Sequence, residues 1–277
     1  MQIARSIPEM KALRGKCEGP VGLVPTMGYL HEGHLELVRI ARRDNPVAVV
    51  SVFVNPTQFA PNEDYKAYPR DLDRDLSMLD RVKTGIVFIP DSSDMYADGY
   101  NTWVDVKGIT AKLEGQARPT HFRGVTTVCN KLFNIVQPHK AYFGQKDAQQ
   151  ALVIKKMVAD LNMNLEVVVC PTVREKDGLA MSSRNTYLTD NERISATVLY
   201  RSLCIARDMF AGGERDAGVI RKAMTDLISQ EAATKIDYVS IANMQTLDEV
   251  IMIEGKALVS LAVRLGKPRL IDNIVLG

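Results

Sequence analysis

Short apolar runs alternate with amphipathic stretches along the first 175 residues of the chain. Five runs rich in β-branched and aromatic residues indicate strands buried on both faces, at 21–24, 47–54, 85–90, 141–143 and 165–170. Between them, apolar side chains recur at helical spacing after Gly33 and over 71–82, 123–137 and 152–161. Buried strands joined by helices predict an α/β fold with a Rossmann-like, doubly wound parallel sheet.

The pattern changes after residue 174. Two helical stretches come first, at 190–210 and 216–231, and the former opens with the capping-box sequence Thr189-Asp-Asn-Glu192. Strand-like runs follow at 236–241, 257–263 and 270–275, with a Gly-Lys-Pro turn between the last two. Helices followed by a short antiparallel sheet predict a second, smaller α+β domain over 176–277, after a first domain over 1–175.

Composition and charge exclude several classes of protein. Of 277 residues, 46% are apolar and 25% charged, which excludes disordered, collagenous and coiled-coil chains. A net charge of +2 argues against non-specific nucleic-acid binding. No apolar run approaches the ~20 residues of a membrane-spanning helix, and the first 14 residues lack the apolar core of a signal peptide. The four cysteines are far apart and include no Cys-x-x-Cys pair, which is typical of a reducing compartment. From charge, apolar runs and cysteines together, we expect a cytoplasmic protein without nucleic-acid or membrane partners.

The most informative stretch is Pro25-Thr-Met-Gly-Tyr-Leu-His-Glu-Gly-His34, between a predicted strand and a predicted helix. There, a doubly wound sheet presents backbone N–H groups and a helix dipole to an anion. Gly28 and Gly33 permit a tight turn and the close approach of a phosphate. His31 and His34 share a helix face and can donate to a phosphate or oppose developing negative charge. Two histidines alone define no metal site, and a structural turn with surface histidines is the alternative.

Two further segments carry phosphate-binding side chains. Gly144-Gln-Lys-Asp147 ends a predicted strand, where the glycine permits close approach, the lysine supplies a point charge and the aspartate can accept from ribose hydroxyls. Hydroxyls and a guanidinium at the expected domain junction could hold a triphosphate when a loop closes: Ser182, Ser183 and Arg184. Each segment alone is also compatible with an ordinary helix cap or an exposed polar linker.

Glutamines indicate a candidate site for a small polar substrate. Gln58 follows the second predicted strand, and Gln149 and Gln150 begin a predicted helix. Side-chain amides in a cleft orient a ligand without adding charge, although either position alone is compatible with plain surface. By contrast, we expect the charge run over 70–75 to be a solvated helix start, including Asp75.

Together these motifs resemble the pantothenate synthetase (pantoate–β-alanine ligase) family, within the larger group of nucleotidyltransferases that carry a His-x-Gly-His signature. The resemblance covers nearly the whole chain and is far more specific than that signature alone. Its motifs are Pro-Thr-Met-Gly-x-Leu-His-x-Gly-His at 25–34, Phe-Val-Asn-Pro-x-Gln-Phe at 53–59, Tyr-Pro-Arg at 68–70, Leu-Glu-Gly at 113–115, His-Phe-Arg-Gly-Val at 121–125, Lys-Leu-Phe-Asn at 131–134, Asp-Gly-Leu-Ala-x-Ser-Ser-Arg-Asn at 177–185 and Arg-Leu-Ile-Asp-Asn at 269–273.

The resemblance implies an ATP-dependent ligase that acts in two steps. Pantoate carboxylate attacks the α-phosphorus of Mg–ATP and gives pantoyl adenylate and diphosphate. The amine of β-alanine then attacks the acyl carbon and gives pantothenate and AMP. The implied cofactors are ATP, as co-substrate, and Mg²⁺. The resemblance also implies a homodimer through the first domain, for which the run from Val47 is a candidate surface.

The resemblance also implies site residues. The catalytic ones are His31, His34 and Lys146, with His34 the expected acid and phosphate partner. The nucleotide would lie against Met27, Gly28, Tyr29, Leu30, His31, Glu32, Gly33, His34, Gly144, Gln145, Lys146, Asp147, Val173, Met181, Ser182, Ser183 and Arg184. Gln58 and Gln150 would hold pantoate, with Gln58 also facing β-alanine, and the second domain would act as a lid. The family commonly has glutamate where this chain has Gln145, so we expect no charged role there.

Two alternatives stay open. A nucleotidyltransferase could leave the nucleotide on a phosphorylated acceptor, although the two glutamines and the lack of an evident extra phosphate clamp disfavour it. A non-catalytic nucleotide-binding module would leave His31, His34 and Lys146 without a reason to converge.

Overall fold

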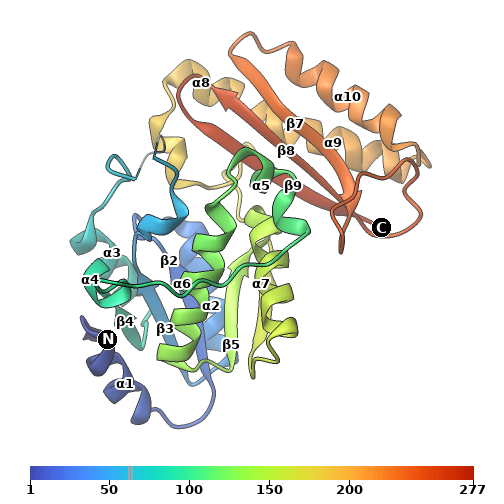
Figure 1. The fold of residues 1–277 in the computed structure, drawn as a ribbon. Coiled ribbons are helices and arrows are strands. Elements are labelled where there is room, and N and C mark those ends of the chain that lie inside the picture. Colours follow the sequence, from blue (N-terminus) through green and yellow to red (C-terminus); the bar gives the residue numbers. More distant parts are fainter. Residues whose placement is uncertain (62, 64) are drawn as a thin grey trace. The chain divides into compact units, whose positions relative to one another are not determined.

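A computed structural model describes residues 1–61, 63 and 65–277, which form two compact units (Figure 1). The first unit comprises Met1–Gln145 and Gln149–Pro171, and the second comprises Lys146–Ala148 and Thr172–Gly277. The chain therefore crosses from the first unit to the second between Pro171 and Thr172, four residues before the boundary that we expected near residue 175. The short segment Lys146–Ala148 belongs to the second unit although it lies in the middle of the first in sequence.

The first unit is built on a six-stranded parallel sheet of order β1-β4-β3-β2-β5-β6. Its strands are β1 (Gln2–Ala4), β2 (Val21–Thr26), β3 (Val47–Val52), β4 (Ile86–Phe88), β5 (Lys140–Gly144) and β6 (Glu166–Cys170). All five expected strands are confirmed, and β1 is an addition. The chain builds outward from β2 to β3 and β4, then returns to place β5 against the other side of β2, with Gly22 opposite Lys140. This reversal is the switch point at which doubly wound sheets bind ligands, beyond the carboxyl ends of the strands.

Helices cover both faces of this sheet. They are α1 (Ile7–Gly15), α2 (Glu32–Asp44), α3 (Leu72–Arg81), α4 (Ser92–Met95), α5 (Glu114–Ala117), α6 (His121–Val136) and α7 (Ala148–Asp160), with 3-10 turns η1 (Pro56–Gln58), η2 (Ile109–Ala111) and η3 (Gln145–Asp147). Alternate strand residues belong to two separate cores: Leu23 packs with α1, α6 and α7, and Val24 packs with α2 and α3. The doubly wound prediction is therefore confirmed.

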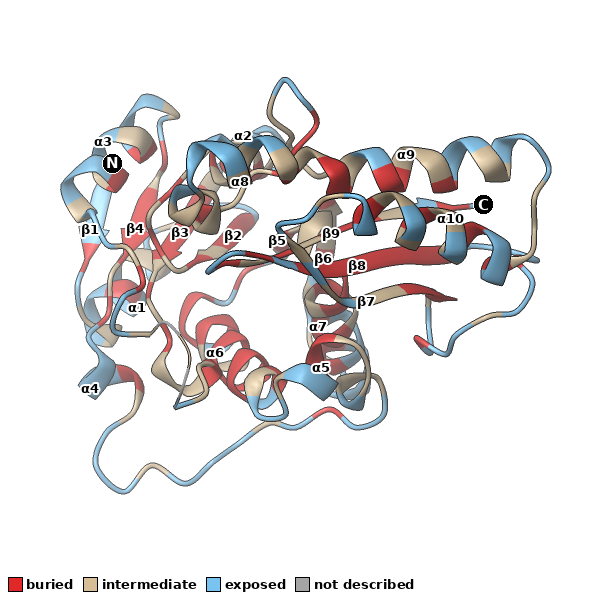
Figure 2. Cartoon of the chain, turned by 90° about the horizontal axis from the view of Figure 1, so that it is seen from above, coloured by how far each residue is buried: buried red, intermediate tan, exposed pale blue. Residues whose placement is uncertain are grey.

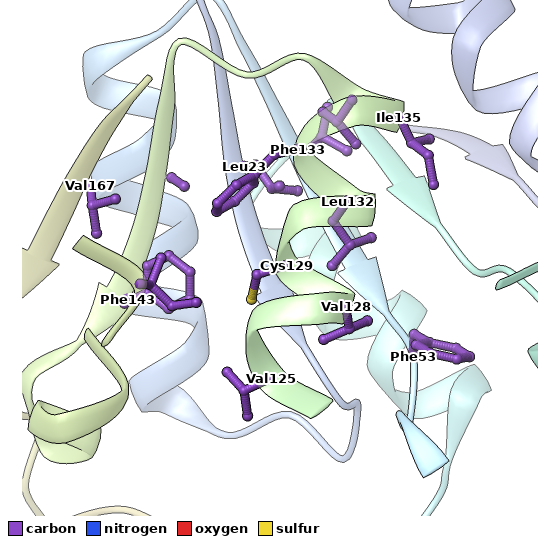
Figure 3. Close-up of a cluster of buried hydrophobic side chains, with 14 of the residues drawn as sticks. Leu23, Phe53, Val125, Val128, Cys129, Leu132, Phe133, Ile135, Phe143 and Val167 are labelled. Atoms are coloured by element: carbon purple, nitrogen blue, oxygen red, sulfur yellow. The ribbon is translucent and has the colours of Figure 1, made fainter. Parts of the chain in front are cut away.

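The larger of these two cores is formed mainly by α6 and the strands. In Figure 3, Val125, Cys129 and Phe133 of α6 project into the cluster that also holds Leu23 and Phe143. The inner strands β2 to β5 are largely buried, as the red colouring of Figure 2 shows. Val47–Val52 lies inside the sheet between β4 and β2 and is almost wholly buried, so this strand offers no surface for a dimer, contrary to our expectation.

The second unit contains an antiparallel sheet of order β7-β8-β9, with strands Thr234–Asn243, Ala257–Leu265 and Arg269–Leu276. Its helices are α8 (Asp190–Ser195), α9 (Thr197–Ala211) and α10 (Ala217–Ser229), with the 3-10 turn η4 (Ser183–Tyr187). The expected helix over 190–210 is divided at Ala196 into α8 and α9, and its capping box is present at Thr189 and Glu192. β8 is the central strand and is buried along nearly its whole length. The α+β prediction is confirmed.

Across the described ranges, the helices are all too short or too polar to cross a membrane.

Candidate active site

A tight turn follows β2 at the switch point of the sheet. Gly28 has φ +80° and Tyr29 has φ +49°, so two successive residues occupy the left-handed region. A Cβ at Gly28 would lie 3.0 Å from Val52 Cγ1 and 3.1 Å from Asp75 Oδ2, so glycine is required both for its backbone and for space. Gly33, by contrast, lies in the first turn of α2 and forms no turn of its own.

Asp75 fixes this turn. Its Oδ2 and Oδ1 accept hydrogen bonds from the backbone N–H groups of Tyr29 and Leu30, both at 2.7 Å. The carboxyl is buried with 1% of the residue exposed, and Arg74 lies beside it at 3.6 Å. Burial raises the pKa of Asp75 above its ordinary value, while the two N–H groups and Arg74 oppose that rise. Our expectation of a solvated charge run is therefore wrong at Asp75, because the turn needs a buried acceptor.

The two histidines of the turn lie against each other. The ring centroids of His31 and His34 are 4.0 Å apart, and His34 Nδ1 accepts a hydrogen bond from the backbone N–H of His31 at 3.3 Å. A neutral imidazole that accepts at Nδ1 carries its proton at Nε2. His34 therefore holds an N–H donor at Nε2, as binding a phosphate oxygen requires.

Gln58 is fixed beside the same turn. Its Nε2 donates to Met27 Sδ at 3.0 Å, and its Oε1 accepts from Asn55 Nδ2 at 3.1 Å. Asn55 is almost wholly buried, and its Oδ1 also accepts from Thr57 and Tyr96. The structure thus brings together two residues that we predicted from separate motifs, Met27 and Gln58. Sequence reasoning missed Asn55, although it lies in the same motif.

Helix α6 packs directly against η1, the turn that carries Gln58. A Cβ at Gly124 would lie 2.5 Å from the carbonyl oxygen of Thr57, a distance that backbone atoms do not tolerate. Asn55 Nδ2 also donates to the carbonyl oxygen of Gly124 at 3.1 Å. Gly124 therefore sets the separation between α6 and the segment that carries Gln58.

A second group of polar side chains holds the backbone of Gln58. His121 Nδ1 lies 2.9 Å and Arg118 Nη2 lies 3.3 Å from the Gln58 carbonyl oxygen. Arg118 also pairs with Glu63 at 2.5 and 2.8 Å. Burial raises the pKa of the Glu63 carboxyl, but the Arg118 guanidinium and the backbone N–H of Ala60 together bring that pKa below its ordinary value. These residues are a further supporting set that sequence reasoning missed.

The two glutamines at the start of α7 have different environments. The Gln149 side-chain amide is engaged entirely with backbone, since it donates to Ile109 and Lys112 and accepts from Glu114. Gln149 is therefore a structural residue that fixes the loop before α5. Gln150 follows it in α7 and is half-buried.

At the end of β5, a Cβ added at Gly144 would meet no described atom within 4 Å, which leaves open space beside that backbone.

Apart from Glu32 and Gln145, which belong to the first unit, the remaining candidates lie in the second unit. Lys146 Nζ is 3.6 Å from Asp147 Oδ1, and the lysine side chain is 19% exposed. Met181 N donates to Val173 O at 3.0 Å, which places those two candidates side by side across a short hairpin. Ser182 caps η4 by accepting from the N–H of Arg184 at 3.2 Å, and Ser183 is buried. This segment is therefore an ordered turn rather than a plain linker.

The described part of the chain contains no group of three or more His, Cys, Asp or Glu side chains that could hold a metal ion.

Fold and site together define a doubly wound α/β protein with a glycine turn and paired histidines at its switch point, an arrangement typical of proteins that bind nucleotides. Residues 2–275 match the family model described as pantoate-beta-alanine ligase. The chain therefore belongs to the pantoate–β-alanine ligase family, a family of enzymes.

Individual relatives agree over nearly their full length. The pantothenate synthetases of Roseiflexus castenholzii and Acetivibrio thermocellus are 56% and 55% identical to the chain, each over at least 99% of both sequences. A crystal structure of the Thermus thermophilus pantothenate synthetase is 46% identical, covers 99% of both chains and superposes with a TM-score of 0.95. A Francisella tularensis pantoate–β-alanine ligase, solved in complex with β–γ ATP and β-alanine, is 36% identical over 99% of this chain and 97% of its own, with a TM-score of 0.83.

Proposed function

We propose that this enzyme condenses (R)-pantoate with β-alanine to give pantothenate, AMP and diphosphate through a pantoyl-adenylate intermediate. The observation that carries the proposal is that a glycine turn at the switch point of the sheet lies against a fixed side-chain amide. The segment 27–34 follows β2 at the switch point of the sheet. The Gln58 side-chain amide donates a hydrogen bond to Met27 of this segment. A phosphate site beside an uncharged, oriented amide suits the reaction of a triphosphate with a small hydroxy acid.

The chemistry assigned to the histidines follows from their hydrogen bonding. In the first step, pantoate carboxylate attacks the α-phosphorus, the bond to the bridging oxygen breaks, and diphosphate leaves with the electron pair. His34 would donate from Nε2 to a phosphate oxygen, and Lys146 would supply a fixed positive charge. In the second step, the amine of β-alanine displaces AMP from the acyl carbon. Enclosure protects the mixed anhydride from water between the two steps.

The rest of the nucleotide site is proposed in the second unit. Asp147, Val173, Met181 and the Ser182–Arg184 turn would complete the contacts to ATP, and the unit would close as a lid over the first unit. Gln150 would join Gln58 in holding pantoate. Mg²⁺ would enter as part of the Mg–ATP substrate, since this ion keeps most of its ligands among phosphate oxygens and water. Binding of β-alanine is supported by the Francisella tularensis relative solved with that ligand.

Location and assembly are proposed from the family. We place the enzyme in the cytoplasm and expect a homodimer through the first unit. Light scattering at micromolar concentration would then return twice the mass of the chain, and the mass of a single chain would remove the dimer from the account.

Isotope exchange tests the adenylate step directly. Labelled diphosphate should enter ATP when pantoate is present and β-alanine is absent, because only a reversible adenylation makes that exchange possible. Exchange without pantoate would indicate a different acceptor. ATP that binds but never exchanges would indicate a non-catalytic binding module.

A further inference from the structure

The Arg-Leu-Ile-Asp-Asn motif at 269–273 has no role in the site described so far. It forms the first half of β9, within the second unit. Asp272 and Asn273 are polar yet only 2% and 4% exposed, which is unusual for side chains of a small sheet. Buried polar side chains are retained where they have specific partners, and both of these residues have partners outside the sheet.

Asn273 holds the backbone of Lys146. Its Nδ2 donates to the Lys146 carbonyl oxygen at 2.8 Å, across 127 positions of sequence. Lys146 lies in the three-residue turn η3, which is too short for a repeating helical hydrogen-bond pattern. The bond therefore ties the lysine backbone to a strand that is paired with β8 along its whole length.

Asp272 holds a second segment of the same unit. Its two carboxylate oxygens pair with Arg174 Nη1 and Nη2 at 2.6 and 3.0 Å, and Arg174 Nη1 also donates to the carbonyl oxygen of Gly178 at 3.0 Å. The guanidinium lies over the ring of Tyr200 at 4.3 Å. A planar guanidinium that donates two hydrogen bonds to one carboxylate and stacks on an aromatic ring is held in a single orientation. Arg174 therefore fixes the hairpin of 173–181, at whose open end Val173 and Met181 are bonded to each other.

We propose that Asp272 and Asn273 of β9 are positioning residues that set Lys146 and the 173–181 hairpin at a fixed separation within the second unit. The proposal rests on the proposed function, in which both segments contact the nucleotide. One rigid strand thereby holds the two segments in register before ATP arrives, and this lowers the ordering cost of binding and of the adenylation step.

An ordinary stabilising role predicts something different from a positioning role. If Asn273 only stabilises the sheet, its loss lowers stability and reduces activity by the same factor whatever residue occupies 146. If it acts through Lys146, its loss matters only while the lysine is present. A double-mutant cycle separates the two cases.

The experiment measures pantoate-dependent diphosphate exchange in wild type, Asn273→Ala, Lys146→Ala and the double variant. We expect Asn273→Ala to lower the exchange rate about tenfold in the wild-type background, the effect of one lost hydrogen bond, and less than about twofold in the Lys146→Ala background. Equal losses in both backgrounds, or no loss in the wild-type background, would overturn the proposal. The matched control is Ser260→Ala, which removes a buried hydroxyl directly opposite Asn273 on β8 and should leave the rate unchanged.

A second measurement does not depend on catalysis. Amide hydrogen exchange of the folded protein should become faster at 145–148 in Asn273→Ala and at 174–181 in Asp272→Asn, but in neither segment in Ser260→Ala. Unchanged exchange in both segments refutes the positioning role even in an active enzyme. An inactive wild type with these expected changes would instead refute the proposed function and leave the positioning role supported.

Discussion

The protonation of His121 gives a quantitative prediction, because this ring supports the backbone of Gln58. His121 Nδ1 lies 2.9 Å from the Gln58 carbonyl oxygen, and its Nε2 lies 3.2 Å from Arg118 Nη1. A carbonyl can only accept and a guanidinium can only donate, so the ring must carry its proton at Nδ1 and none at Nε2. Burial, reinforced by the Arg118 charge, lowers the pKa of His121 from 6.5 to about 4.

This shift links folding stability to pH with a definite sign. Between pH 6.5 and 4 the unfolded chain binds a proton at His121 and the folded chain does not, so the free energy of unfolding decreases as the pH falls. Relative to pH 7.5, the loss is about 1 kcal/mol at pH 5.5 and about 2–3 kcal/mol at pH 4.5. It approaches ~3 kcal/mol once both states are protonated. Above the unfolded pKa the contribution is fully present.

Urea denaturation between pH 7.5 and 4.5 provides the assay, with His121→Asn as the variant. Asparagine retains a donor near the Nδ1 position and cannot titrate, so the stability difference between wild type and variant should shrink by these amounts as the pH falls. The control is Glu63→Gln in the same group of residues. The lowered pKa of Glu63 affects stability only below about pH 4.5, so between pH 7.5 and 5.5 its difference from wild type should be constant. Parallel curves for wild type and His121→Asn would refute a neutral, buried His121.

Three further predictions follow from the site. His34→Ala and Lys146→Ala should each lower the adenylation rate by roughly 10² or more, and near-wild-type single-turnover formation of pantoyl adenylate in both would remove them from the site. Asp75→Ala should lower the free energy of unfolding by about 2–5 kcal/mol, because it leaves two backbone N–H groups without acceptors; urea midpoints within error of wild type would contradict this. Gly124→Ala should raise the KM for pantoate by displacing η1, whereas Gly15→Ala, where a Cβ meets no described atom within 4 Å, should not; equal pantoate KM values in both variants would show that η1 tolerates the shift.

The sheet of the first unit could be predicted because its strands are buried on both faces, which leaves continuous apolar runs in the sequence. The strand β1 could not, because only Ala4 of its three residues is buried and an edge strand of that length has no periodic signal. The division at Ala196 was missed for a related reason, since Thr197 continues the helical pattern without a proline or glycine. The spacing of apolar residues indicates which positions are buried. A very short strand, or a break between two consecutive helices, changes that spacing too little to be recognised in the sequence.

The candidate site shows the same limit. The turn at Gly28 and the proximity of His31 and His34 follow from local spacing and were predicted. The shared helix face was not correct, because His31 is the extended N-cap of α2 and only His34 lies in the helix. The support of the turn by Asp75 was not, because a buried aspartate and a solvated one have the same sequence context when the partner lies 45 or 46 positions away. Long-range polar contacts have no periodicity, so only the folded chain reveals them.

Activation of pantoate and its transfer to β-alanine are the central steps of the proposed function. Mass spectrometry of a mixture of the protein with Mg–ATP, pantoate and β-alanine tests these steps most directly. We expect pantothenate and AMP in equal amounts, with neither formed when pantoate is omitted. ATP consumption that yields ADP, or an adenylated product that accumulates beside unreacted β-alanine, would contradict the proposed function.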